Sequence, residues 1–161
     1  NNAGAAFVVS SSMLQVGTTQ ADVLASYYGE AKKDQFGWAV ANGGALQVGG
    51  EVYHFIAAKG VDVIIANPKN GKPMKANDAG ALYAYKAGAA ERSFKRTGNA
   101  KKGYYGNVLL TVGDVDKDGY TDVITASPFM SRYTPITRKW WKNMGFVEVY
   151  SGEFIVNRPT P

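Results

Sequence analysis

Short runs of apolar and β-branched residues, most of them bounded by glycine or proline, follow one another along the whole chain. Runs of this kind predict strands, several of them buried on both faces. A different pattern covers residues 22–33, where Leu24, Tyr27 and Tyr28 share one side of a predicted short helix. The chain also has 19 glycines and 10 tyrosines, which favours an all-β fold with many turns. The predicted strands cover residues 2–10, 35–41, 51–56, 61–68, 80–85, 107–112, 121–126 and 145–150.

Three features of these strands recur in the same order. Aromatic-glycine pairs begin at Phe36 and at Tyr105, and strands that end in proline cover residues 61–68 and 121–128. Glycine-led strands begin at positions 4, 80 and 145. Self-similarity at such a period indicates a repeat array, and four-stranded units of this length are typical of propeller blades.

This repeat predicts one domain over residues 1–161, a partial β-propeller. It has about two four-stranded antiparallel blades, an extra N-terminal strand and a C-terminal linker. The predicted bounds are approximately 34–87 and 103–152 for the blades, 2–10 for the strand and 153–161 for the linker.

Four aspartates crowd the turn between two predicted strands of the second repeat. At roughly 4 Å, each close pair of carboxylates repels by about 4 kcal/mol, and a bound cation removes that cost. Thr125 stands where an EF-hand has its bidentate glutamate, and both flanks are strands, so an EF-hand is excluded. Oxygen ligands at alternate positions of this turn suit Ca²⁺. The alternative is an acidic turn without an ion. The predicted ligands are Asp114, Asp116, Asp118, Asp122 and the carbonyl of Tyr120, with Gly119 at the bend.

These motifs resemble the FG-GAP repeats of integrin-α-like β-propellers. Phe36-Gly37 and Tyr105-Gly106 stand for the family's FG, while residues 66–68 and 126–128 stand for its GAP. The resemblance implies that the aspartate loop is the family's calcium-binding hairpin. In the first repeat, residues 57–62 are taken as the equivalent loop. They keep only the last carboxylate and place Lys59 near the centre, so one metal site is expected.

Cations and aromatic residues alternate over residues 131–142, which are predicted to leave the second repeat as a long loop. Such a surface can stack on sugars or bases and pair with sulfate, phosphate or carboxylate groups. The alternative is that the tryptophans pack against a neighbouring blade or subunit while the cations stay solvated. The predicted ligand-binding residues are Arg132, Tyr133, Arg138, Lys139, Trp140 and Trp141.

No catalytic constellation is evident. The chain has no cysteine, and its one histidine, His54, lies on a partly alternating strand where packing or exposure is expected. Neither a Gly-x-Ser-x-Gly elbow nor a phosphate-binding glycine loop is present. An enzyme is therefore not expected. No apolar run is long enough for a membrane span, and the net charge of +5 is too modest to indicate nucleic acid.

Two blades cannot close a propeller ring, so other polypeptide chains or copies of this chain are expected to complete it. The first residue is Asn1, which indicates a processed piece of something longer. A calcium-stabilised propeller segment of a secreted or cell-surface protein is the leading hypothesis, with a role in adhesion, ligand binding or assembly. One alternative is a structural subunit of a filament or large complex; another is a lectin-like propeller that binds glycans.

Overall fold

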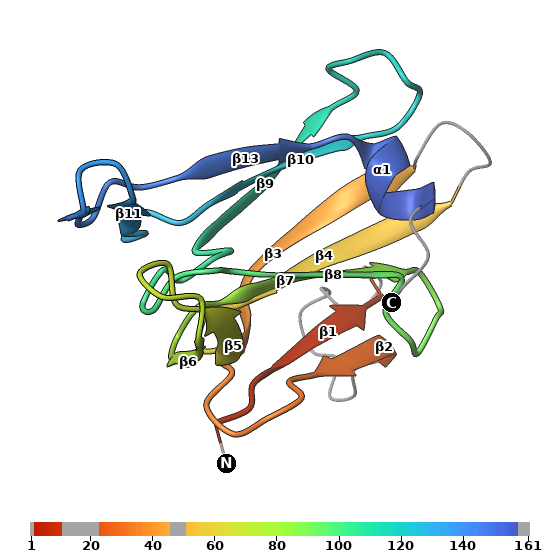
Figure 1. Cartoon of the computed structure of the whole chain (residues 1–161). Coiled ribbons are helices and arrows are strands. Elements are labelled where there is room, and N and C mark those ends of the chain that lie inside the picture. Colours follow the sequence, from red (N-terminus) through yellow and green to blue (C-terminus); the bar gives the residue numbers. More distant parts are fainter. Residues whose placement is uncertain (1, 11–22, 46–50, 158–161) are drawn as a thin grey trace.

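A computed structural model describes residues 2–10, 23–45 and 51–157 of the chain. Antiparallel strands dominate this part, and a single short helix follows the last of them (Figure 1). The all-β prediction is confirmed. The elements are β1 (Ala5–Val9), β2 (Val23–Tyr28), β3 (Phe36–Ala45), β4 (Val52–Ala58), β5 (Val63–Ala66), β6 (Pro73–Ala76), β7 (Ala81–Lys86), β8 (Phe94–Thr97), β9 (Val108–Gly113), β10 (Asp122–Ala126), β11 (Arg132–Thr134), β12 (Lys139–Trp141), β13 (Val147–Tyr150) and α1 (Gly152–Asn157).

Three sheets lie one above another (Figure 1). The middle sheet has four strands in the order β3-β4-β7-β8. The strand pair β1-β2 lies against one of its faces, and the three-stranded sheet β13-β10-β9 lies against the other. Two hairpins, β5-β6 and β11-β12, stand apart from these sheets. Among the described strands no sheet closes on itself.

The middle sheet buries both of its faces because β4 and β7 carry large apolar side chains at successive positions. On the side of β1-β2, Ile56 and Tyr83 join a cluster that Tyr27 completes from β2. On the opposite side, Phe55 and Leu82 pack against the three-stranded sheet. Both clusters therefore depend on strands that are far apart in the sequence.

A repeated backbone junction connects each sheet to the next. Gly4 forms a parallel bridge with Phe36, and Gly80 forms the same bridge with Tyr105. Both glycines have positive φ, at 84° and 83°. A Cβ atom on either would lie within 2.3 Å of a backbone oxygen of the aromatic residue, so the close approach requires glycine.

The hydrogen bonds of the junction repeat as well. The N–H of Phe36 donates to the carbonyl of Ala3, and that of Tyr105 donates to the carbonyl of Ala79, both at 2.8 Å. Gly37 and Gly106, which follow the aromatic residues, have φ values of 85° and 84°. The recurrence of aromatic-glycine pairs in the sequence thus corresponds to one recurring backbone geometry.

The predicted equivalence of residues 61–68 with 121–128 is wrong. The strand that occupies the place of β10, between its two sheet neighbours, is β4. Residues 63–66 instead form β5, which pairs only with β6 and leaves Ile64 69% exposed. Hairpin β5-β6 is thus the counterpart of hairpin β11-β12, since both follow the second strand of their sheet.

Three further segments differ from their predictions. Residues 23–28 form strand β2 and not a helix, because Ala25 and Tyr27 face the core at alternate positions and pair with β1. Residues 131–142, expected as a long loop, form hairpin β11-β12. Where a linker was expected from residue 153, α1 packs Ile155 into the core with no exposed surface.

Candidate functional site

The acidic loop joins β9 to β10 at one end of the three-stranded sheet (Figure 1). Its backbone turns through two residues with positive φ, Lys117 at 66° and Gly119 at 89°. Gly113, with φ of 76°, leads from β9 into the loop and is paired with Asp122. The aspartates are therefore held on a tight turn whose two ends are fixed by the sheet.

Three of these carboxylates converge. Asp114, Asp116 and Asp122 each offer an oxygen, and the three oxygens lie within 4.8 Å of one another. Asp122 is buried, whereas the other two are exposed. Grouped carboxylate oxygens form the donor set that hard divalent cations prefer, so these three residues fit a Ca²⁺ site.

Asp122 connects the loop to the C-terminal helix. One of its oxygens accepts a hydrogen bond of 2.9 Å from the N–H of Val115, and the other accepts one of 3.0 Å from the N–H of Gly152. Its side chain is 2% exposed. Asp122 thus has a structural role that does not depend on an ion.

Asp118 lies outside the group of three. One of its oxygens accepts a hydrogen bond of 2.8 Å from the N–H of Tyr120, and the other accepts from the hydroxyl of Ser151. The bond from Ser151 is the main reason that the pKa of Asp118 is below its usual value. As the structure stands, this carboxylate braces the loop against the segment that follows β13. Its role as a metal ligand stays a prediction, as does that of the Tyr120 carbonyl.

In the first repeat, the equivalent connection joins β3 to β4 and covers residues 46–51, of which 46–50 lie outside the described part. The segment 57–62 predicted for this place instead begins at the end of β4, because β4 and not residues 61–68 is the counterpart of β10. Lys59 stacks its ammonium 3.7 Å from the ring centre of Trp38. The one carboxylate of the true connection, Glu51, is paired with Lys86.

The basic aromatic segment forms a hairpin at the opposite end of β10 from the acidic loop. Tyr133 faces Trp140 across this hairpin, with ring centres 5.4 Å apart. These two residues and Arg132 line a cavity of about 690 Å³. The other predicted ligand-binding residues, Arg138, Lys139 and Trp141, are exposed and do not line it.

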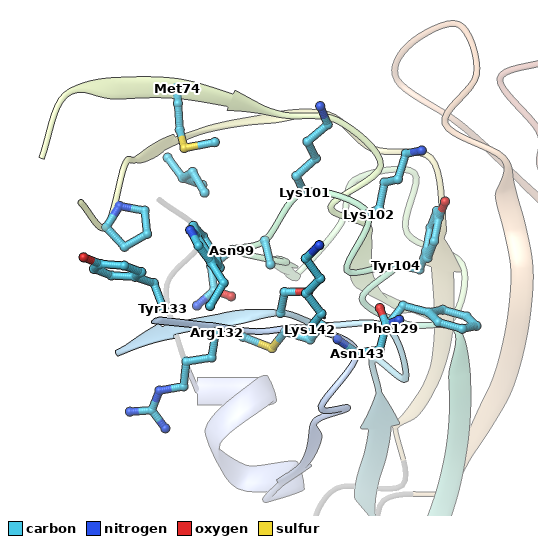
Figure 2. A pocket seen from close by; sticks show the side chains of 16 residues that line it. Met74, Asn99, Lys101, Lys102, Tyr104, Phe129, Arg132, Tyr133, Lys142 and Asn143 are labelled. Carbon is cyan, nitrogen blue, oxygen red and sulfur yellow. Dashed lines mark hydrogen bonds between the residues drawn. The ribbon is translucent and has the colours of Figure 1, made fainter. Parts of the chain in front are cut away.

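The structure adds cavity residues that the sequence pattern did not single out. Ile65 and Met74 come from hairpin β5-β6, and Lys101 and Lys102 from the connection between β8 and β9 (Figure 2). Both lysines lie in a connection between strands, where no sequence pattern marks a cavity. Only the packing of hairpin β5-β6 beside hairpin β11-β12 places them at a cavity.

The described part shows no grouping that suggests catalysis. The imidazole of His54 lies 6.1 Å from the ring of Tyr27, and burial lowers its pKa. None of the described helices is long and apolar enough to cross a membrane.

Comparison with known families gives a match in the second repeat. Residues 106–133 match the model of the FG-GAP repeat, which confirms the resemblance for the second repeat. The match includes the acidic loop, β10 and the start of hairpin β11-β12. No curated protein matched the chain.

Proposed function

We propose that the chain is a calcium-stabilised β-propeller segment that assembles with other polypeptide chains through an uncovered sheet face. In this proposal, residues 1–161 form one partial propeller. The middle and the three-stranded sheets are successive blades, and β1-β2 is half of a preceding blade. The protein would be secreted or at the cell surface, with a role in adhesion, ligand binding or assembly.

The observation that carries the proposal is a contrast between equivalent positions in β7 and β13. Counted from the leading glycines at 80 and 145, Leu82 corresponds to Val147 and Ala84 to Val149. Leu82 and Ala84 have no exposed surface because the three-stranded sheet covers them. Val147 and Val149 are 64% and 58% exposed. Val147 and Val149 thus have the apolar side chains of a sheet-to-sheet interface, but no described sheet covers them.

The same face is apolar across all three strands. Val149 lies opposite Ile124, which lies opposite Leu110, and a parallel row contains Val147, Ala126 and Val108. We call these two rows the open face. An apolar face of this kind, without a polar side chain in either row, favours association with another apolar surface.

Gly145 supports the same interpretation. It shares positive φ, at 71°, with Gly4 and Gly80, but no aromatic segment within the described residues bridges it. The nearest described atom to a Cβ at Gly145 is the carbonyl oxygen of Pro128 at 3.5 Å, so the junction is open. We infer that the partner is a further blade whose first strand begins with an aromatic-glycine pair.

Calcium would have a structural role in this assembly. Asp114, Asp116 and Asp122 would hold the ion, and carbonyl oxygens and water would complete the six to eight ligands that Ca²⁺ takes. The ion would supply positive charge that cancels the repulsion among the carboxylates. The register of β9 and β10, and with it the open face, would then be fixed. The high calcium concentration outside cells suits a site of few protein carboxylates.

Sedimentation and dye binding together test the proposed assembly. If copies of this chain cover the open face, the wild type should self-associate as its concentration rises. If a different chain covers it, the wild type should stay monomeric and bind a dye for apolar surfaces strongly. Val149→Lys should abolish either behaviour, since a charge in the centre of the open face opposes burial. Ile64→Lys is the matched control, because Ile64 is also more than half exposed but lies on hairpin β5-β6.

A monomeric wild type that does not bind the dye would refute the proposal, as would a Val149→Lys variant that behaves like the wild type. Circular dichroism on each variant checks that the fold is kept.

A further inference from the structure

Two equivalent hairpins frame the cavity introduced above. Hairpin β5-β6 forms one wall and hairpin β11-β12 the opposite wall, with residues 99–104 of the connection to β9 between them (Figure 2). Each hairpin is inserted after the second strand of its sheet, so the space between them results directly from the repeat. A volume of about 690 Å³ is within the range that accommodates one or two large side chains or a small ligand.

The apolar part of the cavity lining, called the floor below, is adaptable. It contains two methionines, Met74 and Met130, whose flexible thioether side chains fit bulky groups of different shape. Aromatic rings flank them: Trp140 is paired with Tyr133, and Phe129 packs edge-on against Tyr104 at 5.9 Å. Such a floor provides an anchoring place for a large apolar side chain of a partner.

The rim of the cavity is positively charged. Lys101, Lys102 and Lys142 line it, and no aspartate or glutamate is among the lining residues. None of the ion pairs within the described part of the chain includes these three lysines. Lys142 reaches into the space between the hairpins, whereas the guanidinium of Arg132 points away from it (Figure 2).

We propose that this cavity binds an acidic peptide segment of a partner chain, with one bulky apolar side chain on the floor and flanking carboxylates at the lysines. The lining surface is mostly apolar, although Asn99 and Asn143 belong to it. The hydroxyl of Ser131 already accepts a hydrogen bond from the N–H of Asn143. A sugar would leave most of its hydroxyl groups without partners there. Single-stranded nucleic acid needs a groove that follows its backbone over several nucleotides, and this cavity is compact.

This inference does not depend on the acidic loop or on the open face, because the cavity lies at the other end of β10 and uses none of their residues. Chelation of calcium and the Val149→Lys variant should leave peptide binding in place. The two proposals can therefore fail separately.

Fluorescence polarisation with the whole chain tests the proposal. The probe is a labelled peptide with one phenylalanine flanked on each side by two glutamates. The wild type should bind it, and binding should weaken with salt. Replacing the glutamates by glutamines, or the phenylalanine by alanine, should each weaken binding about tenfold or more.

Lys142→Ala should weaken binding about tenfold, since it removes a charged hydrogen bond at the rim. Lys72→Ala is the control, because this exposed lysine in the turn of hairpin β5-β6 does not line the cavity; binding should stay within about twofold. Met74→Glu should abolish binding by placing a carboxylate on the floor.

Four results would overturn the proposal. They are no binding of the peptide by the folded wild type, equal binding of the uncharged peptide, unchanged binding by both Lys142→Ala and Met74→Glu, and displacement of the peptide by equimolar trigalacturonate. The last result would assign the cavity to an acidic sugar.

Discussion

Gly80 approaches the backbone of Tyr105 more closely than any side chain would allow, in the same bridge that Gly4 forms with Phe36. This contact fixes how the middle sheet meets the three-stranded sheet. Because the Gly80–Tyr105 junction lies between two packed sheets, its loss should destabilise both sheets.

Gly80→Ala should therefore lower the free energy of unfolding by about 2–4 kcal/mol, since a positive φ of 83° and a steric overlap act together. Urea unfolding measures the loss. Gly71→Ala is the control: its φ is 71°, but nothing lies within 4 Å of the added Cβ. It should cost only about 1 kcal/mol. Equal losses in the two variants would show that the close approach contributes nothing.

The hydroxyl of Tyr105 links the segment before β9 to β13 of the same sheet. It donates to Glu148 at 2.5 Å and lies 2.7 Å from the hydroxyl of Tyr150. Burial is the main reason that its pKa is raised, so the hydroxyl stays protonated and can donate. Tyr105→Phe should lower the free energy of unfolding by about 1–3 kcal/mol, because it leaves a carboxylate short of a donor.

Tyr104→Phe is the neighbouring control, since no hydrogen bond of its hydroxyl is found in the described part of the chain. Its change should stay within about 0.5 kcal/mol. Glu148 also accepts a hydrogen bond from the hydroxyl of Tyr150 and lies 3.8 Å from the guanidinium of Arg96. A Tyr105→Phe variant as stable as the wild type would show that these two partners are sufficient.

The strands that sequence reasoning placed correctly are those with a local signal. An aromatic-glycine pair begins residues 36–41, which lie in β3. A leading glycine precedes residues 81–85 and 147–150, which lie in β7 and β13. The error at residues 61–68 has a physical cause. β4 is buried on both faces and so shows little alternation, while β5 is an apolar run that ends at proline. The sequence pattern cannot distinguish a strand inside a sheet from a strand of a separate hairpin when both are apolar.

The acidic loop shows what spacing can and cannot predict. Alternate positions bring Asp114, Asp116 and Asp122 together, because they share one side of a tight turn. The orientation of Asp118 depends on Ser151, which lies 33 residues later and reaches the loop only through the sheet. The cavity lysines depend in the same way on two hairpins from different repeats. Contacts of this range leave no local trace in the sequence.

Saturating Ca²⁺ should stabilise the wild type by about 2.7 kcal/mol when its concentration is a hundred times the dissociation constant. Asp116→Asn should remove this gain but keep the stability measured in EGTA, since Asp116 is exposed and an asparagine oxygen can still accept the hydrogen bond from the N–H of Asp118. Asp122→Ala should lower stability in EGTA as well, by about 2–3 kcal/mol, because two backbone N–H groups lose their acceptor.

The control for calcium is Glu91→Gln, an exposed carboxylate far from the loop in sequence, which should respond to Ca²⁺ as the wild type does. Unfolding in Ca²⁺ and in EGTA, together with calorimetric titration, measures all four proteins. A wild type whose stability is the same in both buffers would exclude the metal site.

His54 gives the chain a stability that depends on pH near neutrality. It is the only histidine, and burial lowers its pKa from the ordinary value of 6.5. The folded state therefore disfavours the protonated ring, and the unfolded chain binds the proton more readily. The contribution to stability is complete above pH 6.5 and is lost as the pH falls through the lower pKa of the folded state.

His54→Gln should remove this dependence of the unfolding free energy on pH. The difference between the two proteins should appear between the range where carboxylates titrate and pH 6.5. Urea unfolding at a series of pH values measures the slope. Because one imidazole is present, its proton resonances report the folded pKa directly. A folded pKa at or above 6.5 would contradict the burial of His54 between β3 and β7, and with it the packing of β1-β2 over this face of the middle sheet.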